Sequence, residues 1–304
     1  MQSLFRFARS LRGRAAWHSS SSHAFSAIAS YCGRSIARWR AHGEWLGFLE
    51  SPAMAGITEL DTVLVERYQH RYISKAWTIE QRLQAIRDHY DFALARFPRA
   101  LFHMLYRERQ VLAGKLTLRD GSKLSLILKA PYRRGREGEL ALSLTDESGL
   151  QLSYVQFSFV DGGRSIVIGC LQGAANQAGR DAVRELTKQC HGLRPKNLLL
   201  SMVRALADAF DVQNVLGIGN DRHVFAGIAN KVKADYDNFW IEAGGELSDH
   251  GFYRLPPREP VRDEAEVESK RRSEFRRREA LRQEACELVV APFGFYRPAM
   301  PMAA

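Results

Sequence analysis

The pattern of apolar and polar positions is clearest between residues 112 and 171. Apolar residues or glycine occupy every second position from Leu112 to Leu118 and from Leu124 to Leu128, and the turn dipeptide Asp120-Gly121 separates the two runs. Such alternation across a tight turn predicts a β-hairpin. Further strands are expected at 140–144, 150–160 and 166–171. The pattern therefore predicts an antiparallel meander of about five strands.

Before the meander, the apolar positions recur at helical spacing. Between residues 57 and 102 they predict two or three helices, which need a sheet to cover. One helix is expected to begin after Thr78, because Gln81 follows three residues later and completes a capping box. Pro98 is expected to end or kink the helix before it, since proline cannot donate a helical hydrogen bond.

After Gly173 the apolar spacing changes from two to nearly four. The change predicts a helix that ends at His191-Gly192 and a second that begins at Pro195, where the missing N–H of proline is tolerated. Val215–Ile218 then predicts a short buried strand. A closing pair of strands is expected at 238–242 and 251–255, joined through Gly244-Gly245. The predicted fold is α+β, with N-terminal helices, an antiparallel meander, a helix pair, a further strand and a closing hairpin.

Charge divides the chain into three parts. Residues 1–43 contain seven arginines and no Asp or Glu, so this N-terminal extension carries most of the net charge of +10. Residues 44–257 hold the α+β pattern. Residues 258–304 form a charged tail, and the mixed acids and bases from Glu264 to Glu287 predict a solvated helix supported by opposite charges three or four positions apart.

The composition indicates a globular protein, with 304 residues of which 45% are hydrophobic. The longest uncharged stretch, residues 15–33, is broken by His and Ser, so no membrane span is expected. Arginines interrupt the only early apolar run, which argues against a secretory signal. The four cysteines share no close spacing, so neither a metal motif nor a disulfide framework is predicted. We expect a cytoplasmic protein that can lie against the inner membrane.

The basic extension 1–43 can attract phosphate on anionic lipid or on nucleic acid, because the attraction depends on charge. Leu4, Phe5, Ala8 and Leu11 recur at helical spacing beside arginines, which predicts a short amphipathic helix for a membrane surface. The composition is also similar to that of an organelle transit peptide, and a flexible solubilising extension is the plainer alternative. No base-reading or stacking motif is present, so nucleic-acid binding ranks last.

A first candidate site follows the last strand of the meander, at Gln172 to Gly179. A strand that passes into a helix exposes backbone N–H groups that can receive a phosphate or carboxylate. Gly173 and Gly179 permit close approach of the backbone. The spacing matches neither the phosphate loop nor the dinucleotide fingerprint, so an ordinary turn is the alternative.

A second candidate site is the junction of the two predicted helices. Arg194 and Lys196 flank the positive end of the second helix, and His191 precedes them. Cations at a helix N-terminus are mildly unfavourable without an anion. These residues therefore favour an anionic ligand or an acidic partner over a purely structural role.

Two further residues are candidates for acid–base chemistry. His223 follows the buried strand and can act as a general base that Asp221 orients, although a structural histidine is the alternative. Glu242 belongs to a run of carboxylates and aromatics that begins at Asp235. The run lacks the spacing of a calcium loop, so no metal is predicted, and a turn before an aromatic edge strand is the alternative.

Taken together, several segments resemble the VirK/YbjX family, a bacterial family named for a domain of unknown function. The resemblance spans residues 45–257 and rests on Arg82-Leu83, Asp88-His89-Tyr90, Ile168-Gly169-Cys170-Leu171-Gln172-Gly173, Thr187-Lys188, His191-Gly192-Leu193-Arg194-Pro195-Lys196, Asp235-Tyr236-Asp237-Asn238-Phe239-Trp240, Glu242 and Gly244-Gly245. It implies a Gram-negative cytoplasmic protein linked to virulence, outer-membrane remodelling and tolerance of cationic antimicrobial peptides. The family supplies no agreed catalytic residues.

The predicted element order is also similar to that of GCN5-related acyltransferases. This similarity implies acyl-CoA binding at Gln172 to Gly179, with His223 or Glu242 as base and a V-shaped opening between strands beside Gln172. The glycine spacing departs from the pyrophosphate loop of that family. Three functions therefore stay open: an envelope-affecting factor of unknown activity, an acyl-CoA-dependent enzyme, and a protein that binds anionic surfaces.

Overall fold

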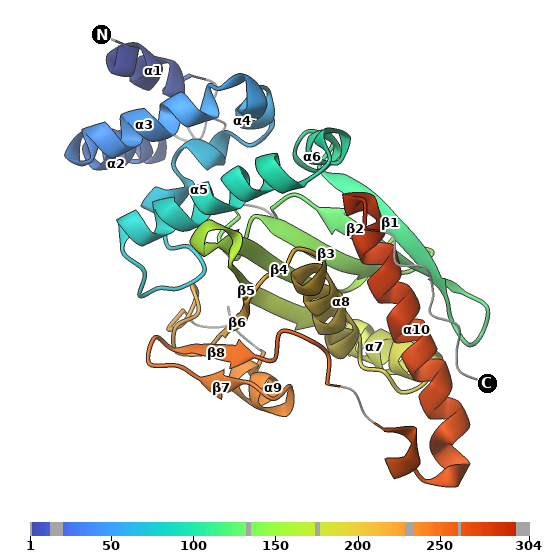
Figure 1. Cartoon of the computed structure of the whole chain (residues 1–304). Coiled ribbons are helices and arrows are strands. Elements are labelled where there is room, and N and C mark those ends of the chain that lie inside the picture. The colour runs from blue at the N-terminus through green and yellow to red at the C-terminus, as the bar shows by residue number, and fades with distance from the viewer. Residues whose placement is uncertain are drawn as a thin grey trace.

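The computed structural model describes residues 2–12, 21–131, 135–173, 177–228, 234–260 and 263–295. Within them the chain forms an eight-stranded sheet in the order β1-β2-β3-β4-β5-β6-β8-β7, shown in Figure 1. The strands are β1 (Gln110–Thr117), β2 (Lys123–Lys129), β3 (Leu140–Thr145), β4 (Gln151–Val160), β5 (Ser165–Gly173), β6 (Asn214–Ile218), β7 (Glu246–Leu247) and β8 (Phe252–Leu255). The β5–β6 pair is parallel, and the other neighbouring pairs are antiparallel.

The meander from β1 to β5 confirms the strand pattern expected from the sequence. Its register places Leu128, Leu142, Val155 and Leu171 side by side on neighbouring strands. All four side chains are buried. Because full burial of such a side chain is worth about 1.5–3 kcal/mol, the alternation itself decides which face of the sheet is covered.

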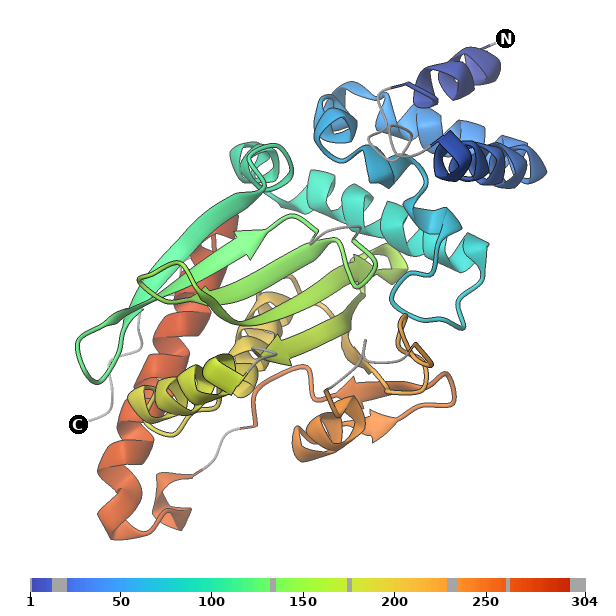
Figure 2. The ribbon, with the colours of Figure 1, turned by 180° about the vertical axis from the view of Figure 1, so that it is seen from behind.

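Helices cover this apolar face. They are α7 (Gln177–Gln189), α8 (Pro195–Ala209) and α10 (Arg272–Val290). Figure 1 shows α8 and α10 in front of the sheet, and α8 packs on β3, β4 and β5. The helices α7 and α8 confirm the pair expected after Gly173. Figure 2 shows the molecule from behind, with the strands in front of α8 and α10.

The charged helix α10 is solvated on one side only, whereas the sequence-based expectation was a fully solvated helix. Leu281, Ala285 and Val289 lie four residues apart and are buried, and α10 packs on α8 and β1. Leu288 approaches Gly114 of β1 so closely that a Cβ there would lie 2.6 Å from its Cδ2. The apolar stripe is narrow and surrounded by charges, so the composition of the segment concealed it.

The N-terminal part is helical. Its α-helices are α1 (Gln2–Ser10), α2 (Ser21–Ala37), α3 (Trp39–Leu49), α4 (Ile57–Leu60), α5 (Ile79–Arg96) and α6 (Arg99–Tyr106). The expected capping box opens α5, because Thr78 Oγ1 accepts from Gln81 N at 3.2 Å and Gln81 Oε1 accepts from Thr78 N at 2.8 Å. The helix ends before Pro98, as expected. Residues 57–69 form α4 and two short 3-10 turns in place of a longer helix.

The first member of the expected closing hairpin is a helix, so that prediction was wrong. Helix α9 (Tyr236–Glu242) occupies the segment, and the hairpin is made by β7 and β8 farther along. Asp235 caps α9, since its side chain accepts a hydrogen bond from Asn238 N. Tyr236 and Trp240 lie four residues apart and are both buried. A short run of aromatic residues is equally compatible with a strand, so the spacing of its apolar positions could not distinguish a helix from a strand.

The short helix α1 packs on the helices that follow. Phe7 stacks on Tyr31 with ring centroids 5.8 Å apart, and Arg6 Nε lies 3.1 Å from Glu50 Oε2. Part of the basic charge of the N-terminus is therefore paired with an acid outside residues 1–43. Among the described residues, no helix combines the length and the apolar character needed to cross a bilayer.

Candidate functional site

Strands β5 and β6 part before β5 ends. The two strands pair from Ser165 to Ile168 of β5, whereas β5 stays paired with β4 as far as Gly173. The last part of β5, residues 169–173, therefore has no partner strand on the β6 side within the described chain. We call this opening the strand gap. It lies beside Gln172, where an acyltransferase-like arrangement requires the neighbouring strands to separate.

Two segments from distant parts of the chain reach into the strand gap. The carbonyl oxygen of Glu137 would lie 2.2 Å from a Cβ at Gly169, so only glycine fits there. The hydroxyl of Tyr236, in the first turn of α9, accepts hydrogen bonds from Leu171 N and Gln172 Nε2, each at 3.4 Å. The Tyr236 hydroxyl thus accepts a hydrogen bond from a backbone N–H that no neighbouring strand of the described chain pairs with.

On the helix-covered side of the strand gap, α7, α8 and α9 enclose a cavity of about 800 Å³, which we call the groove. Gly173 lines it at the end of β5, and Phe239 lines it from α9. Its charged lining residues are Arg184, Lys188, Arg194, Lys196, Asp235 and Glu242. A cavity of this size, mostly apolar with a few charged groups, is typical of small-molecule sites.

Lys196 differs from the other basic residues of the groove. Those residues pair with nearby acids, as Arg194 Nη1 does with Glu242 Oε2 at 3.1 Å. Lys196 has no ion pair among the described residues, and its Nζ lies 5.7 Å from the ring centroid of Phe239. Burial lowers its pKa. A half-buried ammonium group without an ion pair is suited to an anionic ligand.

The structure brings several sequence-predicted site residues to one place. The groove is lined by Gly173, Arg194, Lys196 and Glu242. The side chain of Gln172 lies on the other face of the sheet, because successive residues of a strand point to opposite faces. Gly179 is buried in α7. Residues 174–176, the centre of the expected phosphate-receiving turn, lie outside the described residues.

His223 is fully buried and does not line the groove. Its Nδ1 accepts a hydrogen bond from Phe225 N at 3.2 Å, so in the neutral ring the proton is on Nε2. This Nε2 lies 3.3 Å from Glu137 Oε1 without the alignment of a hydrogen bond. The ring also stacks on Tyr236, with centroids 5.3 Å apart. Asp221 is exposed, so Glu137 is the carboxylate that faces His223.

Cys170 lies beside this histidine–carboxylate contact. It follows Gly169 on β5 and is fully buried, and its thiol interacts with Tyr236, Tyr154 and Glu137. Burial, together with the nearby carboxylate of Glu137, raises the pKa of Cys170 well above its ordinary value. The cysteine is therefore a neutral thiol at physiological pH, which disfavours it as a nucleophile.

Comparison with protein-family models matches residues 20–289 to the family described as Protein of unknown function (DUF535). The chain belongs to this family. The match confirms the resemblance seen in the sequence, and it extends beyond residues 45–257 at both ends.

Relatives of this DUF535 protein are largely uncharacterised. The chain is 27% identical to "Uncharacterized protein YbjX" of Escherichia coli over 81% of this chain and 77% of the relative. It is 32% identical to "Membrane protein LapB" of Mannheimia haemolytica over 49% of this chain and 63% of that protein. Among solved structures, a cAMP-binding acyltransferase from Mycobacterium smegmatis matches 78% of this chain and 66% of its own, at 12% identity and a TM-score of 0.32. A score this low carries no argument about function.

Sequence reasoning missed Glu137 and Tyr236. Glu137 lies in the irregular connection between β2 and β3, where no periodicity marks a residue. Tyr236 lies in the run that begins at Asp235, which the sequence indicated for its carboxylates and not for its phenol. Tyr236 does belong to a segment on which the family resemblance rests, and it is the residue of that run whose hydroxyl reaches the strand gap.

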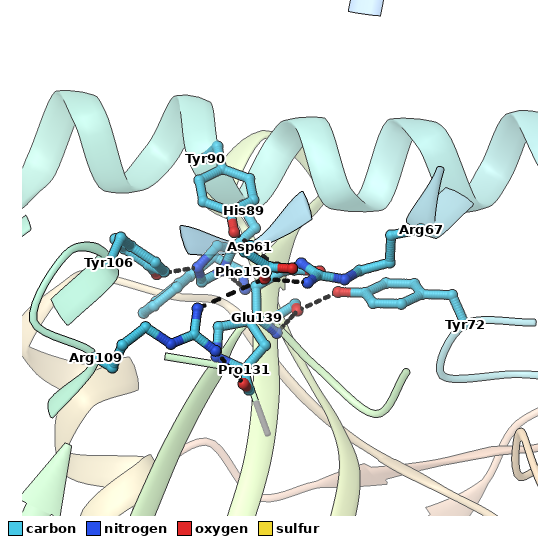
Figure 3. A network of polar contacts seen from close by, with 11 residues as sticks. Asp61, Arg67, Tyr72, His89, Tyr90, Tyr106, Arg109, Pro131, Glu139 and Phe159 are labelled. Carbon is cyan, nitrogen blue, oxygen red and sulfur yellow. Dashed lines mark hydrogen bonds and ion pairs between the residues drawn. The ribbon is translucent and has the colours of Figure 1, made fainter. Parts of the chain in front are cut away.

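A second polar cluster, shown in Figure 3, is fully buried between α5 and the sheet. Arg67 donates to Asp61 and to Glu139 Oε2, the latter at 2.5 Å, and Tyr90 donates to the same Glu139 oxygen at 2.9 Å. Burial raises the pKa of Glu139 to about 7. We call these residues the Arg67 network. Its charged groups pair with one another and do not line the groove, which indicates a structural role in this DUF535 protein.

Proposed function

We propose that this protein binds an acyl donor of the acyl-CoA type in the groove and transfers its acyl group at the strand gap. The observation that supports the proposal is the coincidence of two features. Strands β5 and β6 part next to a cavity of about 800 Å³, and Lys196 lines that cavity without an ion pair among the described residues. A thioester with a phosphate-bearing tail needs an opening for its chain and cations for its phosphates.

The basic lining of the groove suits a phosphate. Arg194 and Lys196 lie at the N-terminus of the 15-residue helix α8, whose dipole adds positive potential there. The Arg194–Glu242 ion pair is exposed, so a phosphate can replace the carboxylate at little cost. Arg184 and Lys188 approach the same cavity from α7.

Tyr236 supplies a protonated group at the reacting end. Burial raises the pKa of its phenol well above the ordinary value, so the hydroxyl stays protonated. In acyl transfer from a thioester, the carbon–sulfur bond breaks and the sulfur must gain a proton. A phenol in the strand gap can donate to the leaving thiol, while the groove holds the rest of the donor.

In this proposal the acceptor belongs to the bacterial envelope. The family resemblance implies links to virulence, outer-membrane remodelling and the response to cationic antimicrobial peptides, and one relative carries the name membrane protein. Acylation of an envelope component connects those links to a single reaction. We accordingly propose a cytoplasmic protein that works at the inner face of the membrane.

A second candidate function, binding to anionic lipid through residues 1–43, is favoured by α1. Leu4 and Phe5 are 63% and 64% exposed, and the guanidinium carbon of Arg9 lies 4.9 Å from the ring centroid of Phe5. This arrangement suits the boundary between headgroups and acyl chains. Leu4→Ser with Phe5→Ser should abolish sedimentation with phosphatidylglycerol vesicles and leave Tm unchanged. Undiminished sedimentation would end this candidate.

Binding of acyl-CoA esters tests the main proposal. Thermal melts of the whole chain with acetyl-, octanoyl- and palmitoyl-CoA should show stabilisation, equivalent to about 2.7 kcal/mol at a hundred times the Kd. Lys196→Glu should weaken binding about tenfold or more, which corresponds to about 1.4 kcal/mol. Lys115→Glu, on exposed β1 away from the groove, is the matched control and should bind as the wild type does. Absence of stabilisation by every ester would refute the proposal.

A further inference from the structure

Glu137 is a mostly buried carboxylate without a cationic partner. Its side chain is 14% exposed, and the group within ion-pair distance of it is the His223 ring. No Lys or Arg among the described residues lies within ion-pair distance of it. Buried carboxylates are normally paired with a cation or fully hydrogen-bonded, because desolvation of the charge is costly. A carboxylate left in this state is a candidate for contact with a ligand.

The position of Glu137 relative to the groove follows from the strand register. Gly173 and Leu171 share the helix-covered face of β5, since Gly173 pairs with Ser153 of the groove and Leu171 with Val155 of the core. Cys170 and Gln172 alternate with them and face the other side. Because Glu137 interacts with Cys170, its carboxylate lies across the sheet from the groove.

A second acceptor on this side, the side-chain amide of Gln156, has an oxygen without a partner in the described chain. Gln156 is the cross-strand neighbour of Cys170 on β4, it is 2% exposed, and its Oε1 has no hydrogen-bond partner among the described residues. Glu137 and Gln156 thus both adjoin Cys170. A carboxylate without a cation and an amide oxygen without a donor together suit a group that is rich in N–H donors and positively charged.

We propose that Glu137 and Gln156 receive a primary amine, and that Glu137 is the base for its acylation. This inference rests on the proposed function and adds the class of the acceptor. Donor and acceptor then approach the strand gap from opposite faces of the sheet. His223 is a positioning residue, because its Nε2 faces Glu137 while Phe225 N fixes its ring through Nδ1.

The reaction balances without a further reagent. The amine nitrogen forms a bond to the thioester carbonyl carbon, Glu137 accepts the proton that the nitrogen loses, and the carbon–sulfur bond breaks. The sulfur takes a proton from the Tyr236 phenol, which Glu137 restores. The products are an amide and a free thiol. Direct transfer needs no acyl-enzyme on Cys170, in keeping with a neutral thiol there.

The test measures thiol release from octanoyl-CoA by the whole chain, with spermidine as amine and glycerol as a hydroxyl control. The wild type should turn over with spermidine and not with glycerol. Glu137→Gln should lower kcat by about 100-fold or more while the octanoyl-CoA Kd stays unchanged. Glu284→Gln, an exposed acid on α10, is the matched control and should keep full activity.

Two variants of His223 test whether this residue positions Glu137, with kcat as the measurement. His223→Phe keeps an aromatic ring against Tyr236 but cannot face Glu137 with an N–H, so kcat should fall while donor binding persists. His223→Gln can again offer an N–H to Glu137 and an acceptor to Phe225 N, and should restore part of kcat. If both variants behave alike, the positioning role is wrong.

Failure of the inference differs from failure of the proposed function. Octanoyl-CoA that binds the wild type while spermidine gives no thiol release overturns the amine subsite. Full activity of Glu137→Gln overturns the base, and equal use of glycerol overturns the acceptor class. No binding of any CoA ester refutes the proposed function instead. In that case, calorimetry with spermidine alone tests the amine subsite. Binding to the wild type that is lost in Glu137→Gln supports the subsite, and no binding to the wild type overturns it.

Discussion

Glu137 and Glu139 lie two residues apart on one segment and meet opposite surroundings. Glu139 is fully buried, and one of its oxygens accepts from both Arg67 and Tyr90 in the network of Figure 3. Glu137 is also mostly buried, yet it faces a histidine and a thiol and no cation among the described residues. The comparison indicates where this fold uses polar groups for stability and where it leaves them open to a ligand.

The cost of each arrangement explains the difference. In the Arg67 network each buried charge is offset by a neighbour, so removal of one member leaves another uncompensated. At Glu137 no Lys or Arg among the described residues offsets the desolvation cost, and its contacts are the Cys170 thiol and the His223 ring. A selected function is the usual reason for a protein to retain such a cost, because replacement by a neutral residue would be stabilising.

The largest effect is expected from Arg67→Met. It removes the guanidinium between Asp61 and Glu139 and leaves both carboxylates buried without their main partner. Loss of about 3–5 kcal/mol of the free energy of unfolding is expected, as for other broken buried ion pairs. Urea denaturation measures it. A loss below about 1 kcal/mol would contradict a structural role for the network.

A smaller effect is expected in how the free energy of unfolding depends on pH through Glu139. Burial raises the pKa of Glu139 to about 7 from 4.5, so between these values the folded state binds a proton that the unfolded state does not. Stability of the wild type relative to Glu139→Gln should therefore increase as pH falls from about 7 to 4.5. Chemical denaturation of both proteins across this range measures the difference. A constant difference, or one of opposite sign, would contradict the assignment.

Glu137→Gln should leave the free energy of unfolding unchanged or raise it by up to about 1 kcal/mol. The substitution removes a buried charge that no cation offsets, whereas the same change at Glu139 breaks contacts with Arg67 and Tyr90. Urea denaturation of the two variants, side by side at pH 8, makes the comparison direct. Equal destabilisation of both would remove the distinction between the two regions.

The smallest effect is expected from Glu242→Ala in the groove. Its ion pair with Arg194 is exposed on both sides, and such pairs contribute about 0–1 kcal/mol. Stability should change by less than about 0.5 kcal/mol, while affinity for acyl-CoA should rise because Arg194 is released for phosphate. Abolished turnover with normal donor binding would instead favour Glu242 as the base.

Much of the fold is determined locally. The alternation between residues 112 and 171 predicts the five-stranded meander, and Thr78 with Gln81 predicts the start of α5, because strand period and capping each depend on neighbours in the sequence. The junction before α8 is equally local, so Arg194 and Lys196 could be placed at a helix N-terminus from the sequence. The segment at Tyr236 was misassigned, since short aromatic runs suit either a strand or a helix.

What the tertiary structure alone decided is which distant residues meet. Arg67 and Glu139 are 72 positions apart, and Glu137 reaches His223 from the connection between β2 and β3. No periodicity relates such residues, because their contact depends on how the sheet register and the loops bring them together. The sequence by itself determined most of the elements, the basic junction before α8 and the family. Only the folded sheet, by parting β5 from β6, decided that the groove and Glu137 lie on opposite sides of one opening.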